Sequence, residues 1–260
     1  MSPTWQGVLE SGLRRLRDGA RRFGIHIQKV PGEDPWPDME PWARGIVERC
    51  RPFSMTSHER LYAVCKGVEY LVEAGIPGDF IECGVWRGGS AMAIALTLRH
   101  LGAVDRELYL FDTYDGMPRP TAADVTADGA PALVVWEKRR LSEGSSTWCR
   151  ASLEEVEACL IGTRYPPHRI HYIKGLVEDT IPGAAPERIA LLRLDTDWYT
   201  STKHELVHLY PRLEPKGIMI VDDYGNWQGA RQAVDEYFTE CGQIMFLARL
   251  DSTGRIGVRA

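Results

Sequence analysis

The chain has 260 residues, of which 44% are hydrophobic and 26% are charged, a composition typical of ordered globular proteins. Its 31 Lys and Arg residues are outnumbered by 36 Asp and Glu residues, giving a formal net charge of −5, so it lacks the broad basic field that non-specific nucleic-acid binding requires. No apolar run approaches the roughly 20 residues of a membrane-spanning helix. We therefore expect neither a nucleic-acid partner nor a membrane partner.

Residues 1–50 are predicted to form an N-terminal helical arm followed by a Pro-rich linker. The five arginines between residues 14 and 22 could form a membrane or partner patch, but a solvated face of the arm helix is the interpretation we favour. The segment has no apolar core of the kind found in secretory signals, so we expect a cytoplasmic protein. The six cysteines form no CxxC pair and none has zinc spacing to a histidine, which indicates buried free thiols in a reducing compartment.

From residue 57 to 75, apolar residues recur at helical spacing, and the pattern ends at Gly75 and Pro77. After this helix the apolar runs become short and mostly continuous, as in strands that are covered on both faces of a parallel sheet. The predicted strands are residues 80–83, 108–111, 171–173, 189–194, 218–221 and 244–250, with predicted helices at 89–101, 152–161 and 200–213. This alternation predicts an open, doubly wound α/β sheet, which binds ligands beyond the carboxyl ends of its strands.

Residues 114–150 do not fit the alternation, because they are long and irregular and contain three prolines and three glycines. Segments of this length in compact domains are usually functional lids or disordered inserts. We expect a lid over the substrate.

The first predicted strand runs into a glycine-containing loop, residues 80–90 (FIECGVWRGGS). The spacing is neither GxGxxG nor a Walker motif. It is the ExGxxxG pattern of S-adenosylmethionine-dependent methyltransferases, in which the loop wraps the amino-acid part of the cofactor. Asp112, at the end of the next predicted strand, is placed to accept hydrogen bonds from both ribose hydroxyls, although it could instead cap a helix.

Four acidic residues follow two further predicted strands: Asp195 and Asp197 after the first, Asp222 and Asp223 after the second. If these strands are neighbours, each like-charged pair at about 4 Å and an effective dielectric constant of about 20 costs roughly 4 kcal/mol. No lysine lies within either motif, although Arg193 is close in sequence. A divalent cation would resolve the repulsion, and oxygen ligands favour Mg²⁺, Ca²⁺ or Mn²⁺ over zinc. An alternative is that the acids only cap the following helices. That could explain Asp197 or Asp223 but does not readily explain all four residues.

At these residues the chain resembles the TylF (macrocin O-methyltransferase) family, whose members methylate sugar hydroxyls of macrolide and aminocoumarin antibiotics. The resemblance covers about residues 50–240 and is carried by six ordered motifs. They are residues 51–60 (RPFSMTSHER), 82–90 (ECGVWRGGS), 111–118 (FDTYDGMP), 174–180 (KGLVEDT), 194–197 (LDTD) and 222–224 (DDY). More distantly the chain is similar to catechol O-methyltransferase, which shares the fold and a metal at the ends of these two strands.

The resemblance implies a class I methyltransferase domain over residues 51–260, with a Rossmann-like, doubly wound, mostly parallel seven-stranded sheet and a lid at about 114–150. It also implies a homodimer or higher homo-oligomer. The implied roles are cofactor binding by Met55, Ser57, Glu82, Gly84, Ser90 and Asp112, Mg²⁺ binding by Asp195, Asp222 and Asp223, and proton removal by Asp197. The family often has Gly where this chain has Thr196 and Met where it has Trp198, two departures on the acceptor side.

We therefore expect an S-adenosylmethionine-dependent, Mg²⁺-assisted O-methyltransferase that acts on a hydroxyl, with a sugar of a glycosylated natural product as acceptor. A rival interpretation takes Asp195-Thr196-Asp197 as the DxD metal motif of a nucleotide-sugar glycosyltransferase, which leaves the loop 82–90 and Asp112 without a role. A second rival is a non-catalytic scaffold that binds the cofactor. His204 and His208 could be alternative bases, but their spacing is also that of an ordinary helix face.

Overall fold

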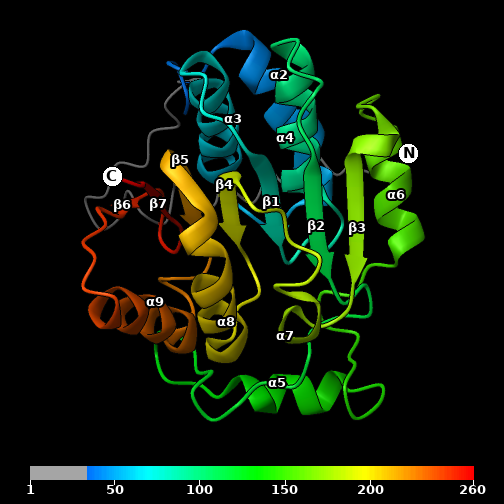
Figure 1. Cartoon of the computed structure of the whole chain (residues 1–260). Helices are drawn as coiled ribbons and strands as arrows, with labels where there is room; N and C mark the ends of the chain where they lie inside the picture. The colour runs from blue at the N-terminus through cyan, green and yellow to red at the C-terminus, as the bar shows by residue number, and fades with distance from the viewer. Residues whose placement is uncertain (1–33) are drawn as a thin grey trace, which may run out of the picture. The chain divides into compact units, whose positions relative to one another are not determined.

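The structure, a computed structural model, describes residues 34–260 (Figure 1). The expected arm helix near the N-terminus lies outside the described residues. Residues 40–260 form one compact unit, and its first helix, α2 (Pro41–Cys50), packs on α3 (His58–Glu73) and α4 (Gly89–His100). Because α2 buries Ala43, Ile46, Val47 and Cys50, it belongs to this unit, whereas we expected the domain to begin at residue 51.

A single seven-stranded sheet with the order β3-β2-β1-β4-β5-β7-β6 forms the centre of the unit. The first five strands in this order are parallel, and β7 joins β5 and β6 in antiparallel pairs. This arrangement confirms the predicted doubly wound, mostly parallel sheet. The strands are β1 (Asp79–Cys83), β2 (Leu108–Asp112), β3 (Ile170–Lys174), β4 (Ile189–Leu194), β5 (Leu213–Val221), β6 (Ala248–Arg249) and β7 (Arg255–Val258).

Helices cover both faces of the sheet because side chains on each strand alternate between the two faces. Ile81, Leu192 and Met219 share one core with side chains of α7 (Val177–Thr180), α8 (Tyr199–Leu209) and α9 (Gln228–Glu240). The opposite face packs on α3, where Gly67 lies against Ile218 and Leu191. Helix α6 (Leu153–Ile161) packs beside α4, and the described residues also form the short 3₁₀ helices η1 (Arg51–Phe53), η2 (Pro167–Arg169) and η3 (Tyr210–Arg212).

Local sequence signals account for where two of these helices begin. The Ser57 hydroxyl accepts a hydrogen bond from the Arg60 amide at 3.1 Å and so caps α3. At α6, a capping box is present: Ser152 Oγ accepts from the Glu155 amide, and the Glu155 carboxylate accepts from the Ser152 amide.

The C-terminal apolar run was predicted wrongly in part. Only Ala248 and Arg249 of the expected strand 244–250 join the sheet, and Ile244 and Phe246 are 96% and 82% exposed. The strand β7 and the helices α5 (Ala132–Arg139) and α9 were not predicted. Helix α9 buries a narrow stripe made largely of small residues, so it contains no long apolar run that would mark it in the sequence.

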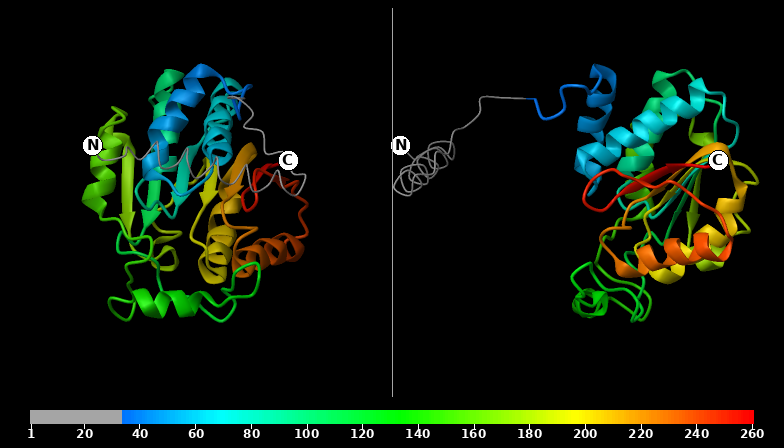
Figure 2. Two further views of the ribbon diagram at one scale, coloured as in Figure 1. Left: turned by 180° about the vertical axis from the view of Figure 1, so that it is seen from behind. Right: turned by 90° about the vertical axis from the view of Figure 1, so that its left-hand side faces the viewer.

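The predicted lid segment, residues 114–150, lies beyond the carboxyl ends of the parallel strands and contains α5 (Figures 1 and 2). It is fastened to the sheet edge by buried groups. The Asp124 carboxylate accepts a hydrogen bond from the Tyr199 amide at 2.8 Å, at the start of α8. Within the segment, the Trp136 indole N–H donates to the Met117 carbonyl at 3.0 Å. The segment therefore has its own folded structure against the edge where ligands are expected.

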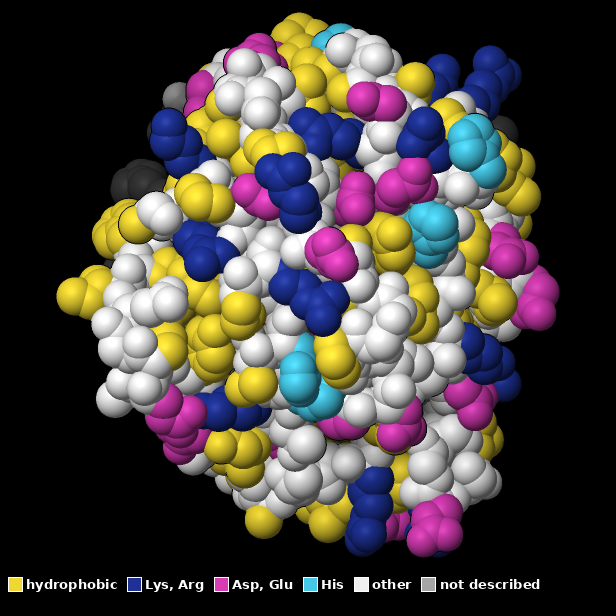
Figure 3. Space-filling model, viewed as in Figure 1, with side chains coloured by type: hydrophobic (Ala, Val, Ile, Leu, Met, Phe, Trp, Pro, Cys, Tyr) yellow, Lys and Arg dark blue, Asp and Glu magenta, His cyan; other side chains and the backbone are white. Residues whose placement is uncertain are grey.

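The surface is mixed in charge on the face shown in Figure 3, where acidic and basic side chains alternate over the same elements. Within residues 34–260, no helix is long and apolar enough to cross a bilayer. The six cysteines are all free, with Cys50, Cys65 and Cys83 buried, Cys149 and Cys159 half-buried and Cys241 exposed, so burial of the thiols is confirmed for the first three and wrong for the last.

Candidate active site

The carboxyl ends of β1, β2, β4 and β5 border a cavity of about 370 Å³. Its wall contains residues that follow each of these strands, as expected for an open parallel sheet. Glu82, Gly84, Ser90 and Asp112 lie on the β1–β2 side, and Asp195, Asp197, Asp222 and Asp223 lie on the β4–β5 side. All eight of these predicted site residues therefore border one cavity.

The loop after β1 requires glycine at position 84, where φ is +83°. A Cβ atom there would collide with the Asp195 carbonyl oxygen, because the ends of β1 and β4 are joined by a 2.8 Å bond from the Asp195 amide to the Cys83 carbonyl. Gly89 opens α4, and a Cβ atom there would lie 2.7 Å from the Phe53 carbonyl oxygen. The glycines thus let the backbones of three segments close around the cavity.

Asp112 secures this loop from the neighbouring strand. Its carboxylate accepts hydrogen bonds from the backbone amides of Val85 at 2.6 Å, Trp86 at 3.0 Å and Tyr114 at 2.7 Å. Burial raises the pKa of Asp112, and these three amide donors oppose that shift. No helix begins at Asp112, so the helix-cap alternative is wrong. The carboxylate fixes the glycine loop and borders the cavity as well.

The segment before α3 contributes a further part of the wall. Met55 is 60% exposed and borders the cavity together with Phe53, Ser54 and Thr56, which the sequence did not single out. Ser57 is absent from the wall because its hydroxyl caps α3.

A buried arginine in β4 organises the acidic groups on the α3 face of the sheet. Arg193 is 1% exposed and lies beside Glu82 in the β1–β4 register. Its Nη1 is 2.6 Å from Glu82 Oε1 and 2.8 Å from Asp195 Oδ2, and its Nη2 is 2.6 Å from Asp222 Oδ1. Arg193 therefore offsets part of the repulsion predicted for the acids. An arginine inside an otherwise apolar strand was the sequence signal for this role.

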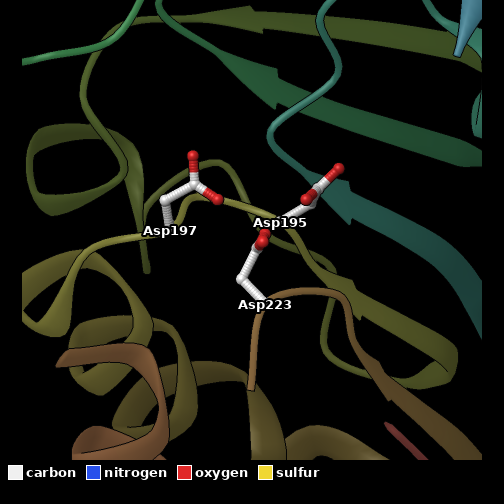
Figure 4. A group of neighbouring side chains, drawn as sticks. All are labelled: Asp195, Asp197 and Asp223. Carbon is white, nitrogen blue, oxygen red and sulfur yellow. The ribbon is translucent and has the colours of Figure 1, made fainter. Parts of the chain in front are cut away.

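Three of the four predicted acids converge, and the fourth is held apart. Asp195, Asp197 and Asp223 offer carboxylate oxygens that all lie within 4.8 Å of one another (Figure 4). We call these three residues the carboxylate trio. Asp222 instead directs its oxygens to Arg193 and to Arg60 of α3, whose Nη1 contacts Asp222 Oδ2.

Asp197 occupies the apex of a tight turn after β4. Its φ is +68°, and the Trp198 amide donates to the Thr196 carbonyl at 2.8 Å across it. The Thr196 hydroxyl in turn donates to Glu205 Oε1 of α8 at 2.9 Å. A non-glycine residue with a positive φ is strained, and such strain persists only where the surrounding structure imposes it. Glu205, fully buried and missed by the sequence reasoning, is part of what imposes it.

The electrostatics of the trio suit a cation. Burial raises the pKa of Asp197 to about 7. A hydrogen bond to Asp223 opposes this shift, and the nearby negative charge of Asp195 adds to it. Burial likewise raises the pKa values of Asp195 and Asp223. Among the described ion pairs, Arg193 contacts only Asp195 of the three. A divalent cation among these oxygens would lower all three pKa values, and all-oxygen donors are the set that Mg²⁺ prefers.

The two histidines of α8 lie away from this chemistry. The His204 and His208 rings are 4.4 Å apart, and His204 Nε2 is 3.0 Å from the Ile181 carbonyl oxygen. Neither borders the cavity. Their place on one helix face agrees with the interpretation that they are not the base.

Residues 44–256 match the model of the macrocin O-methyltransferase (TylF) family. The chain is 34% identical to the 8-demethyl-8-(2,3-dimethoxy-alpha-L-rhamnosyl)-tetracenomycin-C 4'-O-methyltransferase of Streptomyces olivaceus, over 85% of this chain and 81% of the relative. It is 31% identical to the mycinamicin III 3''-O-methyltransferase of Micromonospora griseorubida, over 77% and 76% of the two chains.

Solved structures agree with the sequence relatives. The O-methyltransferase NovP superposes with a TM-score of 0.71 at 28% identity, over 80% of this chain and 82% of NovP. The calicheamicin methyltransferase CalS11 shares the fold, with a TM-score of 0.56 at 18% identity over 89% and 99% of the chains. Because the family model and the relatives span most of its length, the chain belongs to the macrocin O-methyltransferase (TylF) family and is an S-adenosylmethionine-dependent O-methyltransferase.

Proposed function

We propose that this enzyme methylates a hydroxyl group on the sugar of a glycosylated natural product, in antibiotic or other secondary-metabolite biosynthesis, with the assistance of Mg²⁺. The observation that carries the proposal is the carboxylate trio beside the glycine-lined cavity. The printed name of the tetracenomycin relative supports the acceptor class, since the compound that it methylates carries a rhamnosyl group.

The methyl donor is proposed to lie on the β1–β2 side of the cavity. There Gly84 and Ser90 leave room for its amino-acid part, Met55 covers it, and the unpartnered Glu82 Oε2 is free to accept from its ammonium group. Besides its three amide bonds, Asp112 accepts a long 3.5 Å bond from the Thr113 hydroxyl, which a ribose hydroxyl would replace. The role we expected for Ser57 in cofactor binding is replaced by Thr56, which borders the cavity where Ser57 does not.

The residues that would hold Mg²⁺ are Asp195 and Asp223 of the trio, with Asp222 as the expected third ligand. Asp222 differs from the other two because its Oδ2 is paired with Arg60. Asp222 must give up that contact to serve as a ligand, whereas Asp195 and Asp223 already share the trio.

The proton chemistry is proposed for Asp197. A sugar hydroxyl is a weak nucleophile near neutral pH, and bound Mg²⁺ would supply the positive charge that makes it more acidic. Asp197, whose carboxylate borders the cavity, then accepts the hydroxyl proton at a carboxylate oxygen. The turn through Thr196 and Trp198 holds that oxygen at the cavity wall, so positioning contributes to the rate as well.

The proposal is tested by incubating the purified enzyme with S-adenosylmethionine, Mg²⁺ and a panel of glycosylated natural products. We expect a mass gain of one CH₂ unit that depends on both additions. Asp197→Asn should reduce turnover by about 10²–10⁴-fold, the usual contribution of a general base. Asp38→Asn, at an exposed position outside the cavity, is the matched control. Methylation of unglycosylated phenols alone would contradict the acceptor class, and equal turnover of the two variants would contradict the role of Asp197.

Family resemblance further leads us to propose a homodimer or larger assembly that works in the cytoplasm. Light scattering during size-exclusion chromatography measures the first point, and a monomer at assay concentration would contradict it.

A further inference from the structure

Three tryptophans from separate segments meet on the β4–β5 side of the cavity. Trp148 lies near the end of the lid segment, Trp198 follows β4, and Trp227 precedes α9. Their rings are arranged edge to face: the centroids are 5.7 Å apart for Trp148 and Trp198, 6.0 Å for Trp148 and Trp227, and 5.0 Å for Trp198 and Trp227. We call this group the tryptophan corner.

Two of these rings border the cavity and the third supports them. Trp148, which is half-buried, and Trp227, which is 6% exposed, form part of the wall. Trp198 does not border the cavity; it is 3% exposed, and its indole N–H donates to the Pro118 carbonyl at 3.1 Å. The supporting ring is thus locked to the lid segment, which fixes the two rings in front of it.

The corner is tied to the carboxylate trio through the backbone. Trp198 directly follows Asp197 in the chain. The Trp227 amide donates to the Asp223 carbonyl at 3.1 Å, so one turn of backbone links the ring to the acid. A ligand ring resting on Trp148 and Trp227 would therefore lie at a defined place relative to the oxygens that act on it.

The shape of the corner selects a class of ring. The planes of Trp148 and Trp227 are inclined by 61°, so the two rings do not form a parallel slot for a flat ring. A puckered pyranose has C–H groups on more than one side that can contact two inclined aromatic faces. Asn226 also borders the cavity, with its Nδ2 3.4 Å from Asp223 Oδ1, and offers polar groups to further sugar hydroxyls.

We propose that Trp148 and Trp227 are the positioning residues of the acceptor subsite, where they hold the apolar faces of a pyranose ring with its hydroxyl edge toward the trio. This inference rests on the proposed function and adds the residues that select the acceptor. Neither tryptophan takes part in proton transfer.

The test measures binding directly, without turnover. The probe is methyl α-L-rhamnopyranoside, titrated by saturation-transfer NMR into the enzyme saturated with S-adenosylhomocysteine and Mg²⁺. We expect Trp148→Ala to weaken its binding by about tenfold, equivalent to about 1.4 kcal/mol. We expect Trp227→Phe, a smaller change at a buried ring, to weaken it by about threefold, with saturation transfer to the sugar C–H protons reduced in both variants. In turnover, both should raise KM more than they lower kcat.

Trp42→Phe is the matched control, because Trp42 stacks on His100 at the other end of the unit and does not border the cavity. Affinity for S-adenosylhomocysteine, measured by calorimetry, reports whether each variant keeps its fold and cofactor site. Wild-type affinity of both corner variants for the rhamnoside would overturn the inference, as would tighter binding of catechol than of the rhamnoside by the wild type. Failure of the wild type to bind S-adenosylhomocysteine would instead contradict the proposed function.

Discussion

Replacement of Arg193 by methionine is expected to be strongly destabilising. Methionine keeps most of the side-chain length but removes the charge that faces Glu82, Asp195 and Asp222 at 2.6–2.8 Å. At 2.6–2.8 Å and an effective dielectric constant of about 20, the Coulomb energy of each such pair is roughly 6 kcal/mol, which sets an upper limit. Desolvation of the arginine and proton uptake by the acids offset much of this, so we expect a loss of about 3–5 kcal/mol in the free energy of unfolding.

The loss should depend on pH in a defined direction. Burial raises the pKa of Glu82 from 4.5 to about 7 even with Arg193 beside it, and removal of that charge raises it further. An acid whose pKa is higher in the folded state adds stability below its unfolded pKa and loses it as the pH rises through the folded value. Arg193→Met should therefore cost more at pH 8 than at pH 5.5.

Urea denaturation in EDTA at the two pH values measures both effects. The double variant Arg193→Met/Glu82→Gln should recover part of the loss at pH 8, because the neutral amide no longer needs the arginine. A loss below about 1 kcal/mol at pH 8, or one that is the same at both pH values, would refute the account of Arg193 as the charge that holds this edge together.

Three further outcomes follow from single contacts. Glu205→Leu removes the acceptor of the Thr196 hydroxyl and should lower kcat by about 10–100-fold with little change in KM. Glu205→Gln keeps an acceptor and should retain most activity. Equal kinetics of the two variants would argue against a positioning role. Burial raises the pKa of Asp251, but its hydrogen bonds and the nearby arginine charge outweigh this and lower it to about 2, so Asp251→Asn should cost about 1–2 kcal/mol of unfolding free energy at neutral pH. That cost should shrink as the pH falls from 3.8 through 2, and a cost independent of pH would contradict it. In Gly84→Ala the added Cβ meets the backbone of Asp195, so the variant should lose more than about 2 kcal/mol of unfolding free energy and should not bind S-adenosylhomocysteine in calorimetry. A stable variant that binds S-adenosylhomocysteine would contradict this expectation.

Much of the fold was predictable because the parallel strands are continuous apolar runs. The predicted strand 189–194 coincides with β4, and the capping box of α6 marks its first turn. The C-terminal strands were not predictable in the same way. They form an antiparallel edge, where an apolar run such as residues 244–247 remains outside the sheet.

The location of the acidic residues could be predicted from the sequence, but their ion-pair partners could not. Strand ends showed where the acids would gather, since parallel strands bring their carboxyl ends to one edge. Asp222 is separated from the trio because the strand register places Arg193 of β4 between β1 and β5, within reach of Asp222. No local sequence pattern indicates this register. The tryptophan corner joins segments that are far apart in the chain, so only the folded lid segment brings Trp148 to Trp227.

Mn²⁺ binding followed by electron paramagnetic resonance tests the central claim, that Asp195 and Asp223 of the carboxylate trio hold a divalent cation, most directly. With S-adenosylhomocysteine present, the wild type is expected to bind one Mn²⁺ per chain, which Mg²⁺ displaces. Asp195→Asn and Asp223→Asn should lose this binding, Asp197→Asn should keep it, and Asp38→Asn serves as the control at an exposed acid. Unchanged Mn²⁺ binding in Asp195→Asn and Asp223→Asn would contradict the claim.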